Sequence, residues 1–76
     1  MTKYELDSLV DILNKKLYNS YTKLLASNGF YVYRTEADGA FEYEDFLTSD
    51  ESHCIMHVME FNKKDKLISE HWEVAY

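Results

Sequence analysis

Three histidines and one cysteine are the side chains of this 76-residue sequence best suited to metal or acid/base chemistry. His53 and His57 have the spacing that puts side chains on one side of a strand, and pairing of the last two strands would bring His57 beside His71. With Glu73 or Asp45, two imidazoles would make a donor set for a divalent transition metal. Metal sites use three or more converging ligands, and no compact Cys/His spacing provides them here. We therefore expect no metal and no other cofactor; the alternative is a pair of partly exposed histidines that respond to pH.

Nucleophilic catalysis has weaker support. Cys54 lies inside an apolar strand, where a thiol packs and is mostly inert. Ser69 and His71 are two apart on a strand, but no oxyanion-hole loop accompanies them. The two glycines, Gly29 and Gly39, form no phosphate-binding motif. We expect no catalytic residue and a protein that is not an enzyme.

The carboxylates are concentrated in one stretch of the chain. The net charge is −6, from 14 Asp and Glu against 8 Lys and Arg. Residues 1–34 sum to +2, residues 35–62 hold eight acids and no Lys or Arg, and residues 63–76 balance. This charge argues against nucleic acid or an anionic membrane as a direct ligand, because phosphate binding needs basic side chains. The acidic stretch is either a solvated face or a surface that docks a basic partner protein.

Tyrosines lie within or beside the acidic stretch. On a basic sheet they would be candidates for stacking on nucleotide bases, but beside eight acids that interpretation fails. The remaining alternatives are cross-strand packing and an aromatic protein interface, in which tyrosine is enriched. The residues that we predict to form an interaction surface for a basic protein are Tyr31, Tyr33, Glu36, Asp38, Glu42, Tyr43, Glu44, Asp45, Asp50 and Glu51.

A long helix is expected to precede the strands. Thr2 and Glu5 form a capping-box pattern, and apolar residues then recur at helical spacing as far as Asn28-Gly29, a left-handed helix end. We predict one helix over about residues 3–28. Weak helix formers at positions 19, 20 and 22 would allow a kink or break.

Four strands are expected after the helix, at about residues 30–36, 40–48, 53–61 and 67–76. The dipeptide Asp38-Gly39 is typical of a tight hairpin turn. The sequence therefore predicts an α+β fold, with the helix laid across one face of a four-stranded antiparallel meander in a single domain, 1–76. Pairing Phe61 with Leu67 gives the register that joins His57 to His71. Because apolar groups are left on the second face, we also expect a homodimer.

The final hairpin carries a family pattern. Residues 56–74 read as an apolar strand, a turn and a second strand, with the matching positions Asp65, Lys66, Leu67, Glu70, His71, Trp72, Glu73 and Val74. This run resembles the closing hairpin of SnoaL-like members of the nuclear transport factor 2-like superfamily, although the turn glycine of that family is absent. The resemblance implies a curved antiparallel sheet wrapped by helices, often dimeric through the sheet, with a pocket for ligands or simple acid/base chemistry. The catalytic Asp and His of that family have no counterpart here, so no catalytic residue is carried over.

The single cysteine and the lack of an apolar span or signal peptide predict a cytoplasmic protein. Our functional hypothesis is a small acidic, non-catalytic interaction protein. In its most specific form it is an inhibitor that binds the basic surface of a nucleic-acid-handling protein through residues 36–51. The alternatives are a truncated nuclear transport factor 2-like ligand-binding or catalytic module, and a structural dimer whose acidity keeps it soluble.

Overall fold

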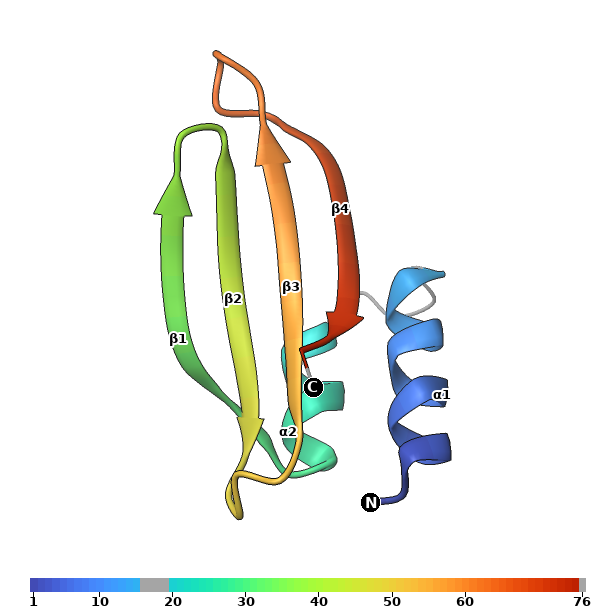
Figure 1. Cartoon of the computed structure of the whole chain (residues 1–76). Helices are drawn as coiled ribbons and strands as arrows, with labels where there is room; N and C mark the ends of the chain where they lie inside the picture. The colour runs from blue at the N-terminus through green and yellow to red at the C-terminus, as the bar shows by residue number, and fades with distance from the viewer. Residues whose placement is uncertain (16–19, 76) are drawn as a thin grey trace.

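The computed structural model describes residues 1–15 and 20–75. Two helices, α1 (Lys3–Asn14) and α2 (Tyr21–Ser27), precede four strands, β1 (Phe30–Asp38), β2 (Phe41–Thr48), β3 (Cys54–Phe61) and β4 (Leu67–Val74). The strands form one antiparallel sheet in the order β1-β2-β3-β4 (Figure 1). The predicted α+β class and antiparallel meander are therefore confirmed, and each strand begins and ends within two residues of its predicted bounds.

The single long helix predicted over residues 3–28 is wrong. Its start is as expected, since Thr2 and Glu5 form a capping box with two hydrogen bonds of 3.1 Å. However, α1 ends at Asn14 and α2 begins after Ser20, while residues 16–19 lie outside the described part of the chain. One helix of that length would measure about 39 Å, against about 27 Å for a strand of eight residues. Neither described helix is long and apolar enough to cross a membrane.

Both helices pack on the same face of the sheet, which we call the helix face; the other is the open face. The core there combines residues from both helices and all four strands: Leu6, Leu9, Leu13, Leu25, Phe30, Phe46, Ile55 and Trp72. Figure 1 shows α2 behind the sheet and α1 beside β4, both near the end of the sheet where the termini lie. The β1–β2 and β3–β4 hairpins extend beyond the helices, so part of the helix face is left uncovered.

A register shift in the last hairpin decides which side chains meet. Phe61 pairs with Leu67 as predicted, but the next pair is Glu60 with Ser69. Ile68 is therefore an extra residue of β4 with no paired residue on β3. Because side chains alternate between the faces of a strand, one extra residue moves every later side chain of β4 to the other face.

The predicted pairing of His57 with His71 is therefore wrong. Trp72 lies opposite His57 on the helix face, and His71 lies opposite Val58 on the open face. A second shift, between Val32 and Arg34, interrupts the pairing of β1 with β2.

Candidate functional site

A buried histidine joins three strands on the helix face. The His57 side chain is 2% exposed; its Nδ1 lies 3.0 Å from Glu44 Oε1 and its Nε2 lies 2.8 Å from Glu70 Oε2. Glu44 on β2 is directly opposite His57. Glu70 on β4 is opposite Met59, which places it diagonal to His57 on the same face. An ionised carboxylate only accepts hydrogen bonds, so both contacts are hydrogen bonds when both ring nitrogens carry a proton. The imidazole of His57 is thus held between two carboxylates.

Two aromatic rings enclose this histidine. The indole of Trp72 stacks on His57, with ring centroids 3.9 Å apart and planes 6° from parallel. Tyr21 of α2 contacts the His57 ring at 5.2 Å, and its hydroxyl donates a hydrogen bond of 3.2 Å to Glu44 Oε1. Burial, followed by the nearby charge of Glu44, raises the pKa of Tyr21, so the hydroxyl keeps its proton at neutral pH. We call these five residues, Tyr21, Glu44, His57, Glu70 and Trp72, the histidine array.

The histidine array connects strands and leaves no ring nitrogen of His57 for a substrate. Both nitrogens face carboxylates, Trp72 stacks on the ring, and Tyr21 makes an edge-type contact with it. The other two histidines lie elsewhere: His53 Nδ1 is 2.6 Å from Ser52 Oγ, and exposed His71 is 3.2 Å from Glu73. Among residues 1–15 and 20–75, no group of three or more His, Cys, Asp or Glu is placed to hold a metal ion.

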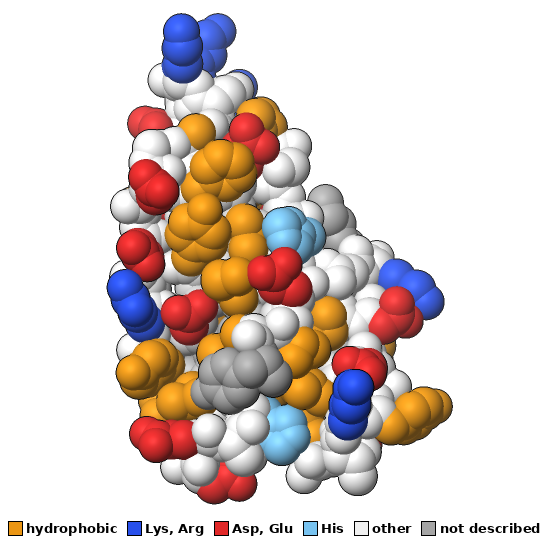
Figure 2. Space-filling model, in the orientation of Figure 1, with side chains coloured by type: hydrophobic (Ala, Val, Ile, Leu, Met, Phe, Trp, Pro, Cys, Tyr) orange, Lys and Arg blue, Asp and Glu red, His pale blue; other side chains and the backbone are white. Residues whose placement is uncertain are grey.

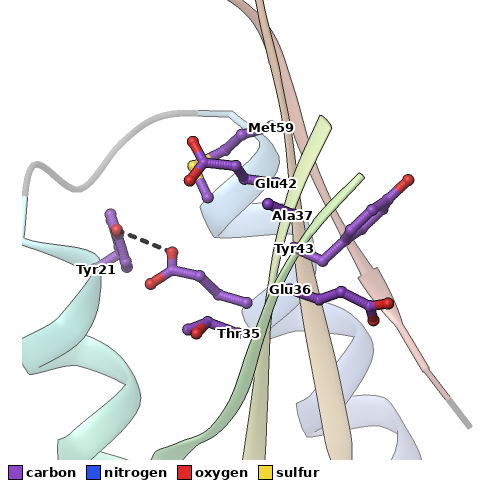
Figure 3. Close-up of a pocket in the computed structure, with 8 residues that line it drawn as sticks. Tyr21, Thr35, Glu36, Ala37, Glu42, Tyr43 and Met59 are labelled. Atoms are coloured by element: carbon purple, nitrogen blue, oxygen red, sulfur yellow. Dashed lines mark hydrogen bonds between the residues drawn. The ribbon is translucent and has the colours of Figure 1, made fainter. Parts of the chain in front are cut away.

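A hollow of about 440 Å³ lies beside the histidine array, lined by Tyr21, Thr35, Glu36, Ala37, Glu42, Tyr43, Glu44 and Met59. Figure 3 shows Tyr21, Glu42 and Met59 on one side of the ribbons, whereas Tyr43 and Glu36 extend from the other side. The hollow thus adjoins the part of the helix face that α1 and α2 do not cover.

The open face combines apolar and acidic side chains. Leu47, Cys54 and Val58 are buried, and the strand register places them on this face, opposite the one on which α1 and α2 pack. Phe41 is 38% exposed and stacks on Tyr43, with ring centroids 6.4 Å apart. Figure 2 shows hydrophobic side chains along the middle of this face, with carboxylates on both sides. The strand register assigns five acids to the open face: Glu36, Asp38, Asp45, Glu60 and Glu73.

The predicted interaction residues do not form one continuous patch. By strand register, the open face holds Tyr31, Glu36, Asp38, Tyr43 and Asp45. Glu42 and Glu44 point to the helix face instead, Tyr33 lies at the β1 shift, and Asp50 and Glu51 lie in the β2–β3 turn.

Two of the predicted interaction residues have local structural roles. Glu44 belongs to the histidine array. Asp50 accepts hydrogen bonds from Thr48 Oγ1 at 2.7 Å and from the Ser52 hydroxyl at 2.6 Å. These bonds, with one from the Ser52 amide, hold the pKa of Asp50 well below its usual range. Asp50 is therefore the organising residue of the turn.

The histidine array itself was missed by reasoning from sequence. His57 was a candidate, but its partners were assigned from a register without the extra residue in β4. The usable signal was strand alternation: Glu44 and Phe46 are two residues apart, so Glu44 shares the face of a large apolar residue that is typical of a core.

Comparison with known proteins gives no relative: no family model, curated protein or solved structure matches this chain. The resemblance of the closing hairpin to the nuclear transport factor 2-like superfamily stays a prediction.

Proposed function

We propose that this chain is a small acidic, non-catalytic interaction protein that binds a basic partner through the open face of its sheet. The observation that carries the proposal is an apolar strip in which Tyr31 and Phe41 are exposed and Tyr43 is partly exposed, bordered by five carboxylates. Within the described strands of this face, Arg34 is the one Lys or Arg, and its guanidinium lies 3.2 Å from the Glu36 carboxylate. A negative field therefore surrounds the strip.

The composition of the open face suits a protein partner. Interfaces commonly have an apolar centre rich in tyrosine and a polar rim, and charge complementarity selects the partner. The matching surface has an apolar centre and Lys or Arg at its rim. A second copy would instead bring five more carboxylates against the first five, so the open face favours a basic partner over itself. The homodimer expected from the sequence stays a prediction.

The more specific proposal is inhibition of a nucleic-acid-handling protein. Surfaces that bind phosphates are basic, so an acidic protein that covers one excludes the nucleic acid. We also propose a cytoplasmic location, in which Cys54 stays a buried thiol. Burial, followed by the charge of Asp45, raises the pKa of this thiol and makes it unreactive.

A non-catalytic role is supported by the histidine array. Its only imidazole is buried and has both nitrogens engaged, so it cannot exchange a proton with a bound substrate without breaking a contact that joins the strands.

The test is affinity capture from the source cell with matched variants. The double variant Phe41→Ala with Tyr43→Ala removes the stacked pair of the strip, and Tyr4→Ala removes an exposed tyrosine on α1 as the control. We expect the double variant to lose the captured protein and Tyr4→Ala to keep it. Equal capture by both variants would contradict the proposal. Release of the captured partner by a short DNA duplex would support the inhibitory form.

The hollow beside the histidine array supports a second candidate, the ligand-binding module implied by the family resemblance. Its volume of about 440 Å³ is within the range of small-molecule sites. The Met59 methyl group, which lines the hollow, is a probe for occupancy by NMR. A shift of this signal with a small organic molecule, absent for the exposed Met1 methyl group, would support this candidate; no shift across a fragment library would contradict it.

A further inference from the structure

The two edge strands of the sheet differ in how their outer backbone is covered. On β4, the side-chain amide of Asn14 accepts a hydrogen bond of 2.7 Å from the Trp72 amide and donates one of 2.9 Å to its carbonyl. On β1, eight of nine residues are exposed. Within the described residues, no hydrogen bond from outside the β1–β2 pair reaches the β1 backbone. About half of the backbone groups of an edge strand point outward, and these are free to pair with another strand.

The side chains of β1 do little to prevent such pairing. Tyr31, Val32 and Tyr33 are 45%, 48% and 59% exposed. The strand contains no proline and no lysine, the residues that commonly protect an edge. Its one cation, Arg34, is paired with Glu36. The first half of β1, up to the register shift between Val32 and Arg34, therefore exposes aromatic and apolar side chains.

The second half of β1 is acidic. Glu36 and Asp38 project onto the open face, and the neighbouring strand β2 adds Asp45 on the same face. A strand added beside β1 would place the side chains opposite Glu36 and Asp38 on this face too, because paired residues share a face. Lysine or arginine at those positions would lie next to the carboxylates.

We infer that β1 accepts an extended basic segment of the partner protein as a fifth strand of the sheet. This inference rests on the proposed function and specifies how the partner is held: backbone hydrogen bonds along β1 give affinity, and lysine or arginine opposite Glu36 and Asp38 gives specificity. A second copy fits this edge less well, because it brings a chain of net charge −6 and another set of the same acids.

The experiment uses the full chain and an acetylated, amidated peptide of alternating lysine and valine. One control peptide has glutamate in place of lysine. The other keeps the lysines but is N-methylated at alternate residues, which removes backbone donors and keeps the charge. Binding is measured by calorimetry, and hydrogen exchange of the β1 amides reports edge pairing. We expect the basic peptide to bind and to slow exchange along β1, and neither control peptide to do so.

Two protein variants with the same change in net charge locate the contact. Glu36→Lys changes the second half of β1, and Asp7→Lys changes an exposed residue of α1, the helix that packs beside β4 at the other edge. The two edges are about 14 Å apart at about 4.8 Å per strand, beyond a Debye length of about 8 Å. We expect Glu36→Lys to weaken peptide binding about tenfold and Asp7→Lys to change it less than about twofold.

Each contrary result overturns the inference in a distinguishable way. Equal binding of the N-methylated peptide, without protection of β1, would mean contact by charge alone and would leave the proposed function intact. Slow exchange along β1 without peptide, together with a concentration-dependent dimer, would assign the edge to a second copy. If the basic peptide does not bind at all, the inference fails, and the proposed function is then decided by the capture experiment with the Phe41 and Tyr43 variants.

Discussion

The two edges of this sheet differ in their contacts with the rest of the chain: β4 is bonded to α1 and to the buried histidine, whereas β1 is mostly exposed. On the β4 side, Trp72 packs in the helix-face core, its backbone is bonded to Asn14, and Glu70 contacts the buried imidazole of His57. On the β1 side, Phe30 is the one buried residue of the strand. A domain of this size buries only about 60% of its unfolded surface. Here four of the eight residues of β3 are buried, against one each in the edge strands β1 and β4. Of the two edges, β4 has the side-chain contacts to α1 and to His57, so stability and binding are expected to depend on opposite sides of the sheet.

The largest expected effect is on the β4 side. Trp72→Ala removes the indole from the core and from the stack on His57, and should lower the free energy of unfolding by about 3–5 kcal/mol. Tyr31→Ala, at a half-exposed position of β1, should lower the free energy of unfolding by less than about 1 kcal/mol. Urea unfolding of the two variants gives the comparison. Similar losses would show that stability is spread evenly across the sheet.

His57 on central strand β3 and His71 on edge strand β4 give the next contrast. His57→Leu removes two hydrogen bonds and leaves the carboxylates of Glu44 and Glu70 without their shared partner, at a cost of about 2–3 kcal/mol. His71→Leu, on the open face, should change stability by less than about 0.5 kcal/mol. Thermal unfolding monitored by circular dichroism measures both. Equal effects would contradict the register that separates the two histidines.

The contact between α1 and β4 is expected to have a smaller effect. Asn14→Ala removes both hydrogen bonds to the Trp72 backbone and should cost about 1–2 kcal/mol. The Trp72 amide should then exchange faster with solvent, whereas amides of β1 should be unaffected. Unchanged exchange at Trp72 would mean that the edge of β4 is protected without Asn14.

The smallest expected effect is the pH dependence contributed by Tyr21. Its pKa is raised above the ordinary value of 10.0 in the folded chain, so the folded state holds this proton more tightly than the unfolded state. The resulting stability is present below about pH 10 and is lost as the pH rises through the folded-state pKa. Between about pH 8 and pH 11, the wild-type chain should lose more stability than Tyr21→Phe. Urea titrations at the two pH values measure the difference, with Tyr4→Phe as the control that should behave like wild type.

Much of the local structure could be predicted from the sequence, because short-range chemistry controls it. The capping box of Thr2 and Glu5, and the turn at Asp38-Gly39, where Gly39 has φ 62°, depend on residues close together in the chain. The strand bounds and the alternation of Phe41 and Glu42 follow from the period of a strand. The helix length was not predictable in the same way, since the apolar pattern runs across the point where α1 ends.

The candidate sites were only partly predictable. The sequence identified Tyr43, Glu36 and Asp38 as surface candidates and His57 as a chemical candidate. Strand alternation separates Glu42 and Glu44 from Tyr43 and Asp45, but it does not say which of the two faces the helices cover. The sequence also gave no sign of the extra residue in β4, so the partners of His57 were assigned wrongly.

By itself, the sequence determined the α+β class, the four strands in meander order and the placement of negative charge between residues 35 and 62. Only the tertiary structure decided that two helices cover one face and that Trp72 rather than His71 meets His57. It also decided that Asn14 bonds the β4 backbone at Trp72 while the β1 edge is left open. The physical reason is that composition and period act along the chain, whereas register and edge coverage depend on contacts between distant residues. One residue of shift in a strand reverses its faces without changing the local pattern.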